Sequence, residues 1–159
     1  MKKILLIILF LFCCYSSTYI EIPSDSIRIR IIANSNSKES QKNKKIVSKQ
    51  VIKIIYNLTE KYDFDDIDTV IINNKPILNK IIKKNINSFS ISYGYNFFPE
   101  KKYKKVIYKS GVYKSLVITL GKGKGKNYWC SLYPRLCLIK ESKKYKFHFL
   151  IKDILFKYN

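Results

Sequence analysis

Hydrophobic residues recur at two different spacings along the first part of the chain. Ile27–Ala33 alternates isoleucine with arginine and then becomes apolar, which predicts a half-buried strand. The polar cluster Asn34–Ser37 that follows offers good helix-capping side chains. Over Lys38–Lys61 the apolar residues return at helical spacing, with lysines on the other faces. We therefore expect a strand followed by an amphipathic helix that packs on a sheet.

Two shorter helices are expected next. Ile67–Ile72 predicts a short helix, and Asn74–Pro76 resembles a cap with proline near the first turn of a second helix that ends at about Lys84. The acidic stretch Asp63–Asp68 comes before them. Its carboxylates at Asp65, Asp66 and Asp68 lack glycine and glutamate at the spacing of a calcium loop, so we interpret them as a helix-start patch.

The second half of the chain is dominated by strand patterns. Ser88–Phe98 alternates apolar and polar residues, and Val106–Tyr108 is a candidate continuation of the same sheet. Val112–Leu120 and Tyr128–Tyr133 are rich in β-branched and aromatic residues and predict two more strands. We expect these last two strands to pair as a β-hairpin.

The order of these elements predicts the fold class. A strand, then helices, then several strands indicates an α+β single domain with a largely antiparallel sheet packed by two or three helices. The pattern of Tyr145–Tyr158 fits either a strand or a helix.

Three glycines alternate with lysines in the loop between the last two strands. Gly121, Gly123 and Gly125 can adopt positive φ where the turn requires it. The loop is not a phosphate-binding P-loop, because Asn127 follows Lys126 where a serine or threonine would hold magnesium. Two interpretations stay open: a flexible, solvated hairpin loop, or a basic loop that docks on an anionic partner.

The N-terminus has the layout of a secretory signal peptide. Met1–Lys3 is positively charged, and Ile4–Phe12 is an apolar run that is too short to span a membrane comfortably. We expect residues 1–18 to be the signal peptide, cleaved or retained as an anchor, and residues 19–159 to be the exported domain.

Export changes the interpretation of the cysteines. Cys130 and Cys137 would be the pair left after processing, and an even pair in an oxidising space favours a disulfide, with the chain reversing at Pro134-Arg135. The alternatives are a zinc site and a catalytic thiol. The chain has a single histidine, His148, so we expect no metal and no cofactor.

Charge and motifs bear on function. Thirty-one basic and eleven acidic residues give a net charge of +20, which suits an anionic polymer or an anionic membrane surface, although the lysines are spread as in a solvated coat.

The sequence has no H-E-x-x-H and no G-x-S-x-G motif, so we expect no enzyme; a secreted hydrolase that uses Cys130 or His148 is the alternative. Trp129, the only tryptophan, is either a packing residue or a partner-binding anchor.

Five segments together resemble a known family. They are R-I-R-I-I-A-N-S-N-S at Arg28–Ser37, Y-G at Tyr93–Gly94 through F-F-P at Phe97–Pro99, G-V-Y-K-S-L at Gly111–Leu116, G-K-G-K-G-K-N-Y-W-C at Gly121–Cys130, and P-R-L-C at Pro134–Cys137. In this order and behind a signal peptide, they are similar to the stage II sporulation protein R family of endospore-forming bacteria.

The resemblance implies an exported signalling protein. Family members are secreted from the forespore into the space between the two sporangial membranes, where they activate a membrane-embedded aspartic protease that processes the mother-cell sigma-E precursor. The protease is then the expected partner, with peripheral contact to anionic membrane, and nucleic acid is not expected. The expected contact residues belong to the motifs: Gly121, Gly123, Gly125, Asn127, Tyr128, Trp129, Pro134, Arg28, Arg30, Asn34 and Ser35.

Overall fold

The computed structural model describes residues 20–60, 66–103, 106–133 and residue 137. The predictions for the signal peptide, Asp63, Asp65, the turn at Pro134-Arg135, His148 and Tyr145–Tyr158 lie outside these residues. The described elements, in chain order, are β1 (Ile20–Glu21), β2 (Ile27–Ile32), α2 (Lys38–Thr59), α3 (Ile67–Asn73), α4 (Lys75–Lys83), β3 (Phe89–Phe98), β4 (Lys101–Tyr103), β5 (Val106–Tyr108), β6 (Gly111–Leu120) and β7 (Asn127–Tyr133).

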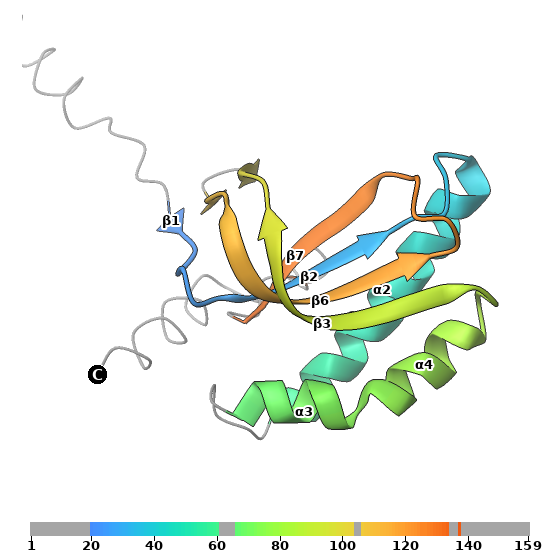
Figure 1. Ribbon diagram of the computed structural model, residues 1–159, viewed down its shortest axis with the longest axis horizontal. Helices are drawn as coiled ribbons and strands as arrows, with labels where there is room; N and C mark the ends of the chain where they lie inside the picture. The colour runs from blue at the N-terminus through green and yellow to red at the C-terminus, as the bar shows by residue number, and fades with distance from the viewer. Residues whose placement is uncertain (1–19, 61–65, 104–105, 134–136, 138–159) are drawn as a thin grey trace, which may run out of the picture.

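The main sheet has four strands in the order β3-β6-β2-β7. β3 pairs antiparallel with β6, and β2 pairs antiparallel with β7, whereas the central strands β6 and β2 are parallel. Helices α2, α3 and α4 all lie on the same side of this sheet (Figure 1). The α+β class and the largely antiparallel sheet are therefore confirmed.

The core forms between the sheet and the helices. Ile27, Ile29 and Ile31 of β2 are at most 2% exposed and pack in one cluster with Val47 and Val51 of α2. Each such aliphatic side chain stabilises the fold by about 1.5–3 kcal/mol on burial. Because alternate strand residues point to opposite faces, the two arginines between these isoleucines lie on the face away from the helices.

The capping prediction for α2 is confirmed. The side chain of Ser37 accepts a hydrogen bond from the Ser40 amide at 3.2 Å, which satisfies one of the free N–H groups of the first turn. In α4, Pro76 occupies the first turn, where its missing N–H costs nothing.

The predicted β-hairpin of β6 and β7 is wrong. β2 lies between these two strands and is hydrogen-bonded to both. The loop Gly121–Lys126 therefore crosses the carboxyl end of β2 instead of closing a hairpin. Local residue patterns predict strands and turns, but they do not show that a strand about 90 residues earlier in the chain inserts between them.

The predicted continuation of the main sheet at β5 is also wrong. β5 pairs antiparallel with β4 and parallel with β1, which gives a separate sheet in the order β1-β5-β4. This small sheet extends from the ends of β3 and β6 (Figure 1). Its strands are too short for their residue pattern to indicate which sheet they join.

Candidate partner-binding face

The glycine-lysine loop is fixed to the β2–α2 connection by four hydrogen bonds. The Gly125 amide donates to the Ala33 carbonyl at 2.8 Å, and the Lys124 amide donates to the Asn34 carbonyl at 3.1 Å. The amides of Lys122 and Lys126 donate to the side-chain oxygens of Asn34 and Asn36, each at 2.8 Å. The interpretation of this segment as a flexible hairpin loop is therefore corrected, because the loop is docked on the end of β2.

Each glycine of the loop is required by its surroundings. Gly121 and Gly123 have φ of 56° and 64°, the left-handed region that glycine adopts without steric cost. Gly125 has ordinary φ, but a Cβ atom there would lie 2.6 Å from the Ser35 carbonyl carbon and 2.8 Å from the Ala33 Cβ. Glycine at 121 and 125 thus allows the loop to pack closely against Asn34 and Ser35.

The loop lysines point into solvent. Lys122, Lys124 and Lys126 are exposed. The Lys44 ammonium of α2 donates to the Lys126 carbonyl at 2.8 Å, and burial, together with the charge of Lys126, lowers the pKa of Lys44. The basic edge available to an anionic partner therefore extends from the loop to α2.

Arg30 and Trp129 lie side by side on the sheet face that the described helices leave uncovered. They are register partners on β2 and β7, and the Arg30 guanidinium carbon lies 4.6 Å from the centre of the Trp129 ring. The same row continues through Val117 of β6 to Ser92 of β3. Arg30 and Trp129 are half-buried, and burial lowers the pKa of Arg30.

Trp129 packs and remains accessible at the same time. Its ring meets Phe98 at the end of β3 edge to face, with ring centres 5.0 Å apart. The contacts with the Arg30 guanidinium and with the Phe98 ring restrict the rotamers of Trp129. A partner would therefore meet a rigid, partly exposed indole, a combination that suits an anchor residue.

Arg28 has a different environment from Arg30. It is 1% exposed, and its guanidinium carbon lies 3.3 Å from the centre of the Tyr113 ring and 5.6 and 5.7 Å from those of Phe98 and Tyr108. Its Nε donates to the Ser26 hydroxyl and its Nη1 to the Lys109 carbonyl, each at 3.2 Å. Burial lowers the pKa of Arg28. Arg28, one of the predicted contact residues, therefore lies in the interior beside the open face, and Arg30 lies on that face.

The remaining predicted residues of β7 divide between the two faces. Tyr128 packs against the core on the helix side, and Asn127 lies on the open face as the register partner of Ile32. Cys130 and Cys137 are at disulfide-bonding distance with Cα atoms 5.5 Å apart, within the usual range. The Cys137 amide donates to the Tyr56 hydroxyl of α2 at 3.0 Å, so this segment is tied to the helical layer.

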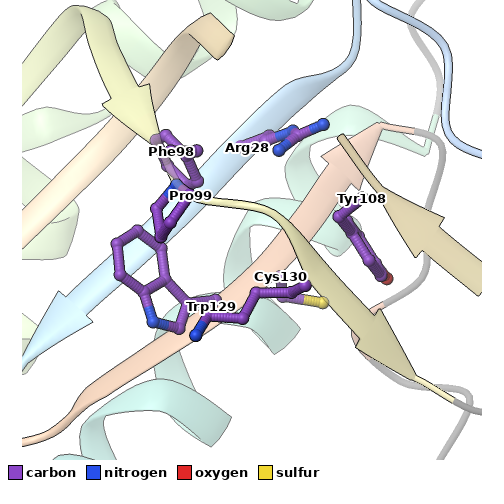
Figure 2. A pocket seen from close by; sticks show the side chains of 7 residues that line it. Arg28, Phe98, Pro99, Tyr108, Trp129 and Cys130 are labelled. Atoms are coloured by element: carbon purple, nitrogen blue, oxygen red, sulfur yellow. The ribbon is translucent and has the colours of Figure 1, made fainter. Parts of the chain in front are cut away.

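A small pocket lies where the motif segments meet. It is lined by Arg28 of β2, Phe98, Pro99 and Lys101 at the β3–β4 connection, Tyr108 of β5, and Trp129 and Cys130 of β7. Figure 2 shows Arg28 between Phe98 and Tyr108, with Trp129 and Cys130 on the neighbouring strand. The sequence indicated Arg28, Trp129 and Cys130 individually but missed the aromatic residues that surround Arg28.

Sequence reasoning also missed a polar cluster between α3 and the sheet. Asp68 accepts hydrogen bonds from the Tyr93 hydroxyl of β3 and the Lys114 ammonium of β6. Burial, and then the contact with Asp68, raises the pKa of Tyr93, and the contact with Asp68 raises that of Lys114. The predicted helix-start patch therefore includes a residue that ties α3 to two strands.

Two features are absent from the described part of the chain. Among those residues, no group of three or more histidine, cysteine, aspartate or glutamate side chains is placed to hold a metal ion. No helix within the same residues is long and apolar enough to cross a membrane.

Comparison with known proteins decides the family. The profile of the family described as stage II sporulation protein R matches residues 23–143. The chain belongs to this family. It is also 33% identical, over 128 residues, to stage II sporulation protein R of Bacillus subtilis (strain 168); the matched region is 74% of this chain and 56% of that relative.

Membership of the stage II sporulation protein R family supports a role in sporulation. The chain spans little more than half the length of its Bacillus relative. No solved structure matches this fold.

Proposed function

We propose that this protein is an exported sporulation signal that activates a membrane-embedded aspartic protease, which then processes the mother-cell sigma-E precursor. It acts as a ligand and not as the hydrolase. It is secreted from the forespore and meets the protease in the space between the two sporangial membranes. Membership of the stage II sporulation protein R family supports the sporulation part of this proposal.

One structural observation carries the proposed docking mode. The segments that resemble the family are far apart in the sequence, yet β2, the end of β3, the start of β6 and β7 all contribute to the surroundings of Arg28 and Trp129. The residues that dominate binding energy at protein interfaces are enriched in tryptophan, tyrosine and arginine, as this cluster is. We place the contact surface on the open face, centred on Arg30 and Trp129.

Activation by such a ligand has a thermodynamic requirement. The ligand must bind the active state of the protease more tightly than the inactive state. Moving an equilibrium from 1:99 to 99:1 takes a preference of about 10⁴-fold, or about 5.5 kcal/mol. A fixed Arg30–Trp129 pair raises the affinity for the state whose surface it fits, because little conformational entropy is lost on binding. A Cys130–Cys137 disulfide formed after export would add to that rigidity.

The test is reconstitution in a bacterium that lacks all three components. The protein, its cognate protease and the sigma precursor are co-expressed, and precursor cleavage is scored by immunoblot. A version without residues 1–18 is the control. Cleavage that depends on the exported form is the expected result. No cleavage, with a protease that responds to another activator, would contradict the proposal.

The high positive charge favours a second candidate function. With a net charge of +20 and exposed lysines on the loop, the protein would bind an anionic wall polymer or membrane surface after export. Affinity for polyanions that falls steeply with salt concentration, without any effect on the protease, would support this function instead.

A further inference from the structure

Arg28 is a buried cation without an anionic partner among the described residues. Glu21 pairs instead with Lys109, and Glu100 pairs with Lys102. Buried charges in folded proteins are almost always paired. The chain moreover has 31 basic and 11 acidic residues, so its overall field disfavours an additional buried cation.

The guanidinium keeps part of its hydrogen-bonding capacity free. Nε donates to Ser26 and Nη1 to the Lys109 carbonyl, but Nη2 is buried and has no hydrogen-bond partner. A guanidinium has five N–H donors, and both hydrogens of Nη2, at the edge of the group, lack an acceptor. That edge can bind both oxygens of one carboxylate.

The pocket supplies the rest of a carboxylate site. The rings of Phe98, Tyr108 and Tyr113 hold the guanidinium plane in place, which removes the need to order it on binding. Lys101, exposed in the pocket lining, adds a second positive charge, and none of the described residues that line the pocket is acidic. The adjacent Trp129 is the centre of the open face proposed to dock on the partner.

We propose that this pocket binds a carboxylate, and that its natural occupant is an aspartate or glutamate side chain of the protein partner that docks on the open face. A single carboxylate matches one free guanidinium edge, and its apolar stem matches the aromatic walls. The identity of the occupant rests on the proposed function; the carboxylate site itself does not.

The site is tested first without any partner. Sodium acetate is titrated into the exported protein, with sodium chloride at equal ionic strength as the control, and the Arg28 Nε–H and Trp129 indole N–H signals are followed by ¹⁵N NMR. We expect saturable shifts with acetate only. Equal shifts with both salts would overturn the site. Saturation with phosphate but not acetate would overturn the carboxylate assignment and indicate a phosphate or lipid headgroup.

Two substitutions separate the effect of the positive charge from that of the bidentate guanidinium geometry. Arg28→Met keeps the length of the side chain and should abolish the Trp129 shift with acetate. Arg28→Lys keeps the charge but loses the bidentate edge, and should weaken acetate binding by roughly tenfold or more. Acetate affinity unchanged in Arg28→Lys would overturn the proposed geometry, and this variant keeps the test decisive if Arg28→Met does not fold.

The protease assay then identifies the occupant. If acetate binds and a folded Arg28→Met protein loses precursor cleavage, the partner's carboxylate occupies the pocket. If acetate binds but this variant activates as well as the wild type, the occupant assignment fails while the activating function stands. Absence of cleavage with the wild type contradicts the proposed function alone, because the acetate result does not depend on the protease.

Discussion

Replacement of Gly125 by alanine tests whether the loop docks on the end of β2 as described. A Cβ atom there would approach the Ser35 carbonyl carbon to 2.6 Å and the Ala33 Cβ to 2.8 Å. Both residues lie just after the end of β2. Relieving such an overlap costs about 1–3 kcal/mol. The shift would also weaken the loop hydrogen bonds to Ala33 and Asn34, each worth about 1 kcal/mol. We expect Gly125→Ala to lower the free energy of unfolding by about 2–4 kcal/mol.

Gly94 in β3 provides a matched control. A Cβ atom at that position has no other atom within 4 Å, and the residue is not in the left-handed region. Gly94→Ala should leave stability unchanged or raise it by up to about 1 kcal/mol, since alanine reduces the entropy of the unfolded chain. Both variants are measured by urea unfolding, followed by Trp129 fluorescence. If Gly125→Ala is no more destabilising than Gly94→Ala, the docked loop is refuted.

Three further predictions concern the surroundings of this loop and of β3. Replacing both Cys130 and Cys137 by serine should lower the free energy of unfolding by roughly 2–3 kcal/mol, and a reductant should have the same effect on the wild type but none on the variant. Asn34→Ala removes the side-chain acceptor of a loop amide and should cost about 1 kcal/mol in urea unfolding; a change below the experimental error would show that this bond contributes nothing. Because the pKa of Tyr93 is raised in the folded state, the contribution of its hydroxyl to stability is fully present below about pH 10 and is lost as the pH rises above 10. The difference in unfolding free energy between wild type and Tyr93→Phe should therefore be constant from about pH 7 to 9 and shrink above about pH 10. A difference that grows above about pH 10 would contradict the burial and the Asp68 contact assigned to Tyr93.

Local sequence patterns were sufficient for most elements. The alternation in β2, the helical spacing in α2 and the capping serine at residue 37 each depend on neighbours within a few positions, and the structure confirms them. The hairpin prediction failed because pairing partners are not local. β2 has two hydrogen-bonding edges, and only the complete fold shows that β6 and β7 occupy both.

The candidate site was only partly predictable for the same reason. Arg30 and Trp129 were selected from separate motifs, but their contact follows from the register of β2 with β7. The aromatic surroundings of Arg28 come from the ends of three other strands, which no periodicity relates. The composition of the glycine loop predicted a turn. It did not indicate that the loop docks on Asn34 and Asn36, whose side-chain oxygens accept hydrogen bonds from the loop amides.

The open face around Trp129 is the surface that we propose activates the protease. The most direct test is precursor cleavage in the reconstituted system with Trp129→Ala, compared with Tyr95→Ala. Tyr95 is a suitable control because it is 72% exposed and lies on the helix side of the sheet, opposite Trp129. It is two residues from the core-packed Tyr93 and therefore shares that residue's face.

Both variants are first shown by immunoblot to be exported, and by urea unfolding to be folded. For an anchor worth about 2 kcal/mol or more, we expect Trp129→Ala to lower precursor cleavage by roughly 30-fold. Tyr95→Ala should support cleavage as well as the wild type does. Wild-type cleavage with a folded, exported Trp129→Ala protein would contradict the proposal.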